Sequence, residues 1–408
     1  MSPTLGLPAV NFFVADVGGG MGPFLSTWLV QVEHWSPDRI SAVLSMALIA
    51  GMVLSTPAGM LIDRVGRPRL MLAMTCCSIL AGTLAMFGVR GFWPVVLAQL
   101  MVAAGGALAG PALTALTLAT VGKAGFPMQQ GVNQAATHAG NVAAAALIWA
   151  ISFVIGPAAS IAVLGVMAAG MLTVLAYIPK DVVDHRRMAG CHRHEAHSLW
   201  VMLRNRRLFV LSMALGLFNL GNGAMLPLIG QRLAASGATA DPTQWMAIYV
   251  VVAQMVMIPV SWAAGHSAHY FGRRSVLIAA CVTLAVRGVL TTMSAHPLWL
   301  SMTEVLDGVG AGLISVAGPA AIADLTYGGG RTQTAMGVLG TVQSFASVLS
   351  FTVGAFLAQH FGWPAAFGGL ALFPIGGVAL LLTIHLMDEF PTAHISSGMA
   401  PALAPSER

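Results

Sequence analysis

Two carboxylates lie close together inside an apolar stretch of this sequence. Glu304 and Asp307 are three residues apart, so on a helix they share one face. A charged side chain in the middle of a membrane-spanning helix costs about 2.5 to 3.5 kcal/mol, so each needs a partner or an aqueous cavity. Two carboxylates at this spacing repel each other, and one of them tends to hold a proton unless a cation compensates. The pair is therefore a candidate for proton coupling.

Two further charged residues complete this candidate set. Arg287 lies in the preceding apolar stretch, so a second interpretation is a fixed buried ion pair between Arg287 and Glu304 that joins two helices. Asp307 is then the better candidate for the coupling carboxylate. Asp16 is the alternative, in the first apolar stretch beside the glycines at 18–20. It either caps a helix break at these glycines or faces a solute from a broken helix.

Polar uncharged residues recur on faces of other apolar stretches. Their amides and imidazole suit the hydroxyls, carbonyls or carboxylates of a solute. The same groups also form hydrogen bonds between membrane helices, worth about 0.6 kcal/mol on average, and both interpretations stay open. The candidates for a substrate cavity are Gln134, His138, Asn141, Asn219, Asn222 and Gln343.

The composition indicates which elements position these residues. Of 408 residues, 57% are hydrophobic and only 8% are charged, whereas an ordinary soluble domain has about 25% charged residues. This excludes a water-soluble enzyme and a disordered chain. Unbroken apolar runs such as 40–62 exclude a membrane barrel, whose strands alternate apolar and polar residues. We therefore expect an all-α integral membrane protein.

Twelve apolar runs are long enough to cross a bilayer. A hydrocarbon core of about 30 Å requires about 20 apolar residues per helix. The first run reads as a retained helix and not a signal peptide, because no Lys or Arg precedes Arg39 and no small-residue cleavage site follows a short apolar core. The predicted spans are 8–32, 40–62, 69–89, 92–120, 131–155, 158–179, 208–233, 244–265, 275–294, 297–322, 334–360 and 363–387.

The basic residues predict the orientation of these spans. If both termini are inside, only Arg39, Arg90 and Arg232 lie on the outer side. Arg287 lies within a span, and the other basic residues fall on the inner side. Basic residues near span ends resist translocation, so we expect a multi-pass protein of the cytoplasmic (inner) membrane with both termini in the cytoplasm. The positive charge suits anionic lipid. No basic patch interleaved with aromatic residues indicates nucleic acid.

Two fragments of the sequence recur about 207 residues apart. The segment 59–67 (GMLIDRVGR) recurs at 265–273 (GHSAHYFGR), and 109–112 (AGPA) recurs at 317–320. The offset contains six spans, an even number, so both copies enter the membrane in the same direction. We therefore expect two parallel six-helix bundles, 1–180 and 208–387, with a connector, 181–207, and a cytoplasmic tail, 388–408.

The segment from Gly59 to Arg69, between the second and third spans, resembles the signature loop of the major facilitator superfamily, and a weaker copy lies between the eighth and ninth spans. With the span number, the connector and the duplication, the resemblance covers essentially the whole chain. It implies two bundles that rock around a central cavity lined by spans 1, 4, 7 and 10.

The loop predicts a latch between the two bundles. A carboxylate at Asp63 can accept hydrogen bonds at a helix N-terminus, Gly66 permits a tight turn, and Arg67 can pair across the interface. The alternative is a generic basic turn on the cytoplasmic side. Because His269 stands where Asp63 stands in the first copy, we expect the second latch to be weaker. The gating candidates are Gly59, Asp63, Arg64, Gly66, Arg67, Gly265, Gly272 and Arg273.

The connector contains several side chains of the metal-ligand type. Their spacing is irregular and no second cysteine is nearby, which favours a solvated loop over a metal site. No phosphate-binding sequence of the Gly-x-x-x-x-Gly-Lys-Ser/Thr type occurs, so an ATP-driven pump is excluded for this chain alone. The connector residues are His185, Cys191, His192, His194, Glu195 and His197.

These features predict a secondary active transporter that moves a small organic solute across the membrane by alternating access, with proton coupling. The alternatives are an uncoupled facilitator and a drug or metal-complex efflux permease. An enzyme is not expected, because no nucleophile and base cluster at one membrane face. The expected partners are a small-molecule substrate, protons and membrane lipid, with no cofactor and no nucleic acid, and we expect a monomer.

Overall fold

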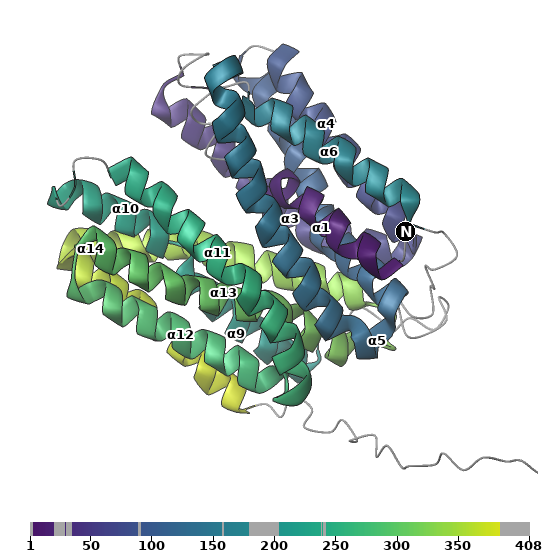
Figure 1. Ribbon diagram of the computed structural model, residues 1–408. Coiled ribbons are helices and arrows are strands. Elements are labelled where there is room, and N and C mark those ends of the chain that lie inside the picture. The colour runs from purple at the N-terminus through teal and green to yellow at the C-terminus, as the bar shows by residue number, and fades with distance from the viewer. Residues whose placement is uncertain are drawn as a thin grey trace, which may run out of the picture.

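The computed structural model describes residues 3–19, 29, 35–88, 91–156, 159–178, 204–237, 239 and 242–383, and these residues form helices and no strands. The N-terminal half contains α1 (Pro3–Gly19), α3 (Pro37–Val65), α4 (Pro68–Gly88), α5 (Phe92–Ile155) and α6 (Ala159–Tyr177). The C-terminal half contains α9 (Arg206–Asn222), α10 (Met225–Ser236), α11 (Pro242–Tyr270), α12 (Arg273–Met293), α13 (Pro297–Thr326) and α14 (Thr332–Thr383). The two halves form separate groups of helices that lie side by side (Figure 1).

Two of these helices each contain two membrane spans that meet at a glycine. Gly122 interrupts α5 with a φ of 69°, and Gly362 interrupts α14 with a φ of 83°. A positive φ is strained for residues with a side chain, so glycine suits both breaks. When the arms are counted separately and α9 is joined to α10, the described helices are consistent with the twelve predicted spans. Eight described helices are long and apolar enough to cross a membrane, and two more apolar helices are shorter.

The boundaries differ from the predicted spans in two places. The predicted loop at 121–130 is helical, because the second arm of α5 begins directly after Gly122. The predicted span 208–233 corresponds to one apolar span, Arg206–Ser236, which has a local irregularity between Asn222 and Met225 that divides it into α9 and α10. Much of the first predicted span, the connector from 181 to 203 and the tail lie outside the described residues.

Local sequence signals explain several helix ends. Pro37 stands in the first turn of α3, where its missing N–H is not needed. Gly66 ends α3 with a φ of 65° and donates its N–H to the carbonyl oxygen of Ile62. The side chain of Asn205 caps α9 by accepting from the N–H groups of Arg207 and Leu208.

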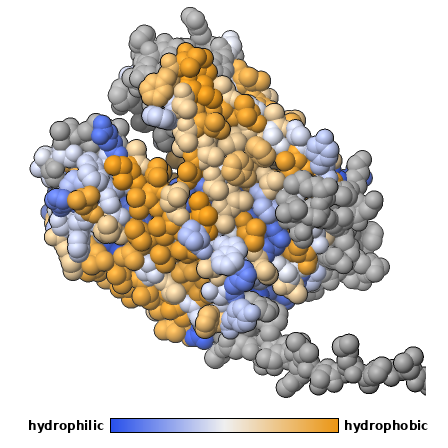
Figure 2. All heavy atoms as spheres, in the orientation of Figure 1, coloured by the Kyte–Doolittle hydropathy of each residue, from blue (hydrophilic) through white to orange (hydrophobic). Residues whose placement is uncertain are grey.

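The distribution of apolar residues is that of a protein surrounded by lipid. Large apolar side chains such as Trp149, Phe153 and Val154 are mostly exposed on α5. Broad apolar areas cover the visible surface of both halves (Figure 2). Several polar residues are instead buried, among them Arg287 and Glu304. Backbone groups in a bilayer must be paired within the helix, which accounts for the all-helical architecture.

The two halves meet in two close helix crossings at which glycines bring backbone against backbone. In the first, a Cβ on Gly59 of α3 would collide with the carbonyl oxygen of Gln333 of α14, and one on Gly337 would collide with that of Ser55. In the second, a Cβ on Gly131 of α5 would lie 2.7 Å from the carbonyl oxygen of Ser261 of α11, and Gly265 lies against the same turn. We call the end of the molecule that holds these crossings the latch end.

The two crossings repeat the sequence duplication in three dimensions. Gly265 follows Gly59 by 206 positions, and Gly337 follows Gly131 by the same number. The offset read from the sequence therefore relates the two contacts between the halves. At the opposite end, on the side of α10, the space-filling view shows a notch between the halves (Figure 2).

We predict that Gly59→Ala opens the latch end. The added methyl group cannot fit against the backbone of α14, so the closed arrangement should lose population. The measurement is the distance between spin labels at Leu70 and Phe271, which are exposed on opposite halves, in a protein without its native cysteines. Gly51→Ala on the same helix is the control, because nothing lies within 4 Å of its Cβ. Equal distance distributions in the two variants would contradict the packing argument.

Candidate functional site

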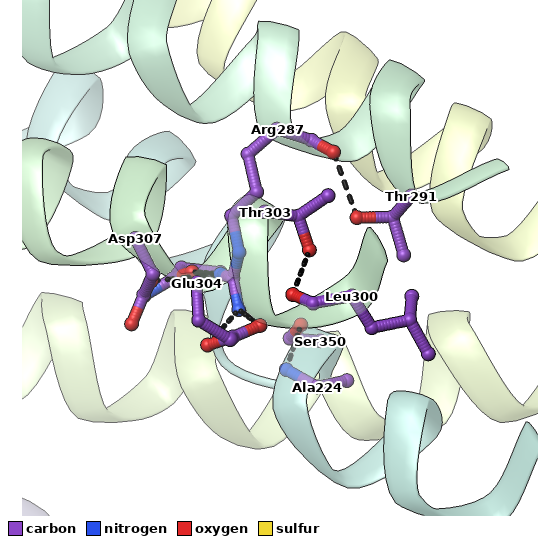
Figure 3. A network of polar contacts seen from close by, with 9 residues as sticks. Ala224, Arg287, Thr291, Leu300, Thr303, Glu304, Asp307 and Ser350 are labelled. Atoms are coloured by element: carbon purple, nitrogen blue, oxygen red, sulfur yellow. Dashed lines mark hydrogen bonds and ion pairs between the residues drawn. The ribbon is translucent and has the colours of Figure 1, made fainter. Parts of the chain in front are cut away.

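A guanidinium group in the C-terminal half binds two carboxylates at once (Figure 3). Nη2 of Arg287 on α12 donates to both oxygens of Glu304 on α13, at 2.8 and 3.0 Å. Nη1 donates to Oδ1 of Asp307 at 2.7 Å and to Oδ1 of Asn222 at 2.6 Å. The structure thus brings three of the four predicted coupling residues together. The side chain of Asp16 lies outside the described residues.

This Arg287 cluster contains one negative charge more than positive charge when both carboxylates are ionised. Arginine stays protonated in proteins, so the excess can be removed only by a proton on one carboxylate. The Glu304 side chain is 0% exposed, whereas that of Asp307 is 13% exposed. Asp307 is therefore the more accessible carboxylate of the cluster.

Asn222 joins the cluster because the helix that carries it ends there. α9 stops at Asn222, and α10 starts at Met225. The freed N–H of Ala224 donates to Oγ of Ser350 on α14 at 2.9 Å. We predicted Asn222 as a cavity residue, and the structure places its amide oxygen on Arg287 instead.

A cavity of about 300 Å³ lies between the two halves. Gln134 of α5 and Gln343 of α14, both predicted as cavity residues, line it. Sequence reasoning missed four further polar residues on its wall: Asn11 of α1, Ser55 of α3, and Thr114 and Gln130 of α5. The spacing of Gln130 and Gln134, four residues apart on one helical face, was an available signal.

The other predicted cavity residues form contacts between or within helices. Nδ1 of His138 on α5 lies 2.7 Å from Oε1 of Gln254 on α11, across the two halves. Asn219 donates to the carbonyl oxygen of Leu215 in its own helix. Asn141 is half-buried on α5 and is not among the described residues that line the cavity.

Asp63 caps a helix of the opposite half. Its Oδ1 accepts from the N–H of Gln333 at 3.1 Å, and its Oδ2 accepts from the N–H and Oγ1 of Thr334 at 2.7 and 2.6 Å. These groups belong to the first turn of α14, where the helix dipole favours a negative charge. Arg67 is exposed, and the structure shows no ion pair for it with the described residues. Arg64 is exposed in the last turn of α3.

The second copy of the loop is held by a different ion pair. Nε of Arg273 lies 2.9 Å from Asp324 at the end of α13. Lys123 of the N-terminal half lies 4.0 Å from the same carboxylate and donates to the carbonyl oxygen of Asp324 at 3.4 Å. Gly272 starts α12 with a φ of 78°. Sequence reasoning missed Asp324, which follows the predicted span end at 322 by two residues. The His269 side chain is not described.

Metal binding has no candidate in the described part of the chain, where no three His, Cys, Asp or Glu side chains are grouped to hold an ion. The predicted connector cluster of 185–197 lies outside the described residues.

We predict that Arg287→Met destabilises the protein strongly. The substitution would leave two carboxylates without their shared cation, at a cost of about 3 to 5 kcal/mol. Thermal melting of the purified protein measures the effect, and Arg39→Met, at an exposed position, is the control. Adding Glu304→Gln to Arg287→Met should recover part of the loss. A melting temperature equal to that of the Arg39→Met control would contradict this role of the cation.

We also predict that Asp63→Ala shifts the protein toward opening at the latch end. Loss of a capping side chain costs about 0.5 to 2 kcal/mol, so the ratio of closed to open molecules should fall by about twofold to thirtyfold. The spin labels at Leu70 and Phe271 report this change. Arg67→Ala should change their distance much less, because its side chain is exposed. An equal shift in both variants would favour a generic basic turn over the cap.

Comparison with known proteins agrees with this architecture. The model of the Major Facilitator Superfamily matches residues 9–286 and 264–405. An "Uncharacterized MFS-type transporter" of Mycobacterium tuberculosis (strain ATCC 25618 / H37Rv) is 32% identical over 405 residues, which cover 97% of this chain and 96% of that protein.

Two solved structures have a similar fold. One is the proton:xylose symporter XylE bound to 6-bromo-6-deoxy-D-glucose, with a TM-score of 0.70, 14% identity and coverage of 94% of each chain. The other is FucP in the outward conformation, with a TM-score of 0.73, 11% identity and coverage of 94% of this chain and 98% of that one. The chain therefore belongs to the Major Facilitator Superfamily and is a multi-pass membrane transporter, not an enzyme.

Proposed function

We propose that this transporter couples the movement of a small organic solute to that of a proton, and that Asp307 carries the proton. The observation that supports this most directly is the sharing of Arg287 by two carboxylates inside membrane-spanning helices. A structural ion pair needs only one carboxylate. The second one gives the cluster a site at which a proton changes the net charge from −1 to zero.

Protonation of Asp307 changes more than the charge of the cluster. Nη1 of Arg287 binds Asp307 and Asn222 together. A neutral Asp307 attracts this nitrogen less, because hydrogen bonds to a charged acceptor are about twice as strong as neutral ones. Nη1 of Arg287 then binds Asn222, at the end of α9, more strongly relative to Asp307. The proton is thereby linked to the position of a discontinuous helix.

Alternating access requires that the latch end open in one state. The contacts that must separate there include the two glycine crossings, the hydrogen bond between Thr56 and Thr341, the cap of α14 by Asp63, and the approach of Lys123 to Asp324. We propose that the bundles 1–180 and 208–387 move as units when these contacts break. All of them lie at one end, which is why a small set of residues can control access to the cavity.

The latch end faces the cytoplasm in this proposal. Its loops carry Arg64, Arg67, Arg273 and Arg274, and basic residues are retained on the cytoplasmic side. Both termini then lie in the cytoplasm, and the protein resides in the cytoplasmic (inner) membrane in contact with anionic lipid. One chain supplies both the cavity and the charged cluster, so a monomer suffices.

The test is uptake into proteoliposomes of a solute first identified by its effect on thermal melting. Asp307→Asn mimics the permanently protonated state, so it should abolish accumulation driven by a pH gradient and preserve exchange between equal concentrations. Asp16→Asn tests the alternative carboxylate in the same assay. Gradient-driven accumulation retained by Asp307→Asn would overturn the assignment. Retention in both variants would favour the uncoupled facilitator.

A further inference from the structure

We infer that the solute is a compact, uncharged molecule with hydroxyl or amide groups, and that Thr114, Gln130 and Gln343 bind it. The inference rests on the proposed function, because it takes the cavity between the halves as part of the transport path. It adds the chemical class of the substrate, which the charged cluster does not determine.

Three polar residues of the cavity wall have free hydrogen-bonding capacity, whereas Asn11 and Ser55 donate to carbonyl oxygens of their own helices. Thr114 and Gln130 are each 7% exposed, and Gln343 is half-buried. All three line the cavity, and the structure shows no hydrogen bond between any of them and another described residue. Gln134 is held only loosely, by a bond of 3.5 Å to the carbonyl oxygen of Ser315. A buried polar group without a partner costs about 1 to 3 kcal/mol, so these side chains favour a polar ligand.

The kind of polar group on the wall defines the kind of ligand. Each glutamine amide offers donors and an acceptor side by side, and the threonine hydroxyl offers both. A hydroxyl or amide on the solute also donates and accepts, so it can satisfy both atoms of each amide. A carboxylate can only accept and an ammonium can only donate, so each would satisfy only part of these groups and leave the others without a partner.

Charge compensation is missing along the described wall of the cavity. None of its described residues has an ionisable side chain. On α13, Asp307 lies twelve residues before the wall residue Pro319, which corresponds to about 18 Å along a helix. Without a counter-ion nearby, a charged solute would lose its hydration with little in return. The described wall therefore favours an uncharged solute.

The volume and the apolar part of the wall limit the size and shape of the solute. A cavity of about 300 Å³ is about ten times the volume share of a water molecule and lies at the small end of ligand sites. Leu113, Met336 and Leu339 form an apolar part of the wall. A solute with one polar edge and one apolar face fits this combination.

The experiment compares solutes of equal size and different charge. Sugars, polyols, and alkyl and aryl amides are each paired with the corresponding carboxylate and amine. Thermal melting of the purified full-length protein identifies the compounds that bind, and calorimetric titration gives their Kd. We expect at least one neutral compound to raise the melting temperature, and its charged analogues to bind at least about a hundredfold more weakly.

Variants of the wall connect this binding to the cavity. Gln130→Leu and Gln343→Leu should each weaken the neutral compound by about tenfold, and the second position keeps the test open if the first variant does not fold. Gln244→Leu, the same change at an exposed position near the start of α11, should leave its Kd unchanged. The inference is overturned if no neutral compound binds, if a charged analogue binds more tightly, or if the wall variants bind like the control.

These outcomes are separable from failure of the proposed coupling, because binding is measured without a pH gradient. If a neutral compound binds both the native protein and Asp307→Asn but is not accumulated under a pH gradient, the substrate class is supported and the proposed coupling is overturned. If a pH gradient drives accumulation of a charged compound, the coupling is supported and the substrate class is overturned.

Discussion

The sharing of Arg287 between Glu304 and Asp307 is the interaction on which the C-terminal half depends. A cation buried among membrane helices is tolerable only where its partners are fixed around it. Glu304 binds it through both oxygens and is completely buried, whereas Asp307 and Asn222 share the other nitrogen. Three helices, α9, α12 and α13, are therefore held at one point. The same arrangement leaves one carboxylate in excess, so the requirement for stability and the capacity for a proton arise from the same atoms.

The contact between the halves follows a different principle, because it has to form and separate. Glycines at 59, 131, 265 and 337 let backbones approach closely without interlocking side chains. The polar contacts at the latch end include the Asp63 cap on α14, the hydrogen bond between Thr56 and Thr341, and the approach of Lys123 to Asp324. Gln134 and His138 of α5 add contacts to Ser315 and Gln254 of the other half. The two glycine crossings share the 206-residue offset, but these polar contacts differ. Duplication thus preserved the packing surface while each copy acquired its own charged latch.

The sequence was sufficient to predict contacts that depend on depth and helical spacing. Glu304 and Asp307 are three residues apart and Arg287 lies at a similar depth on the next span, so their meeting could be expected. Asp63 was expected to cap a helix, but the sequence did not indicate which helix. Asn222, Lys123 and Asp324 could not be placed, because their roles arise from a helix break and from the packing of distant segments. Gln130 was missed because the start of its helix was predicted eight residues too late, which placed it in a loop.

One helix carries residues of all three functional regions. Along α13, Glu304 and Asp307 bind Arg287, the carbonyl oxygen of Ser315 accepts from Gln134 at the cavity, Pro319 lines the cavity, and Asp324 pairs with Arg273. α13 is one helix from Pro297 to Thr326, and a two-state element contacted by several sites is the physical basis for coupling between them. Pro319 within it has no N–H, which leaves the carbonyl oxygen of Ser315 available to Gln134. Because the charged cluster lies away from the uncharged cavity, electrostatic attraction cannot couple proton binding to the binding of a neutral solute. Coupling between them requires such an element. In the proposed mechanism, movement of α13 supplies that connection, and Asp324 at its far end extends it to the latch.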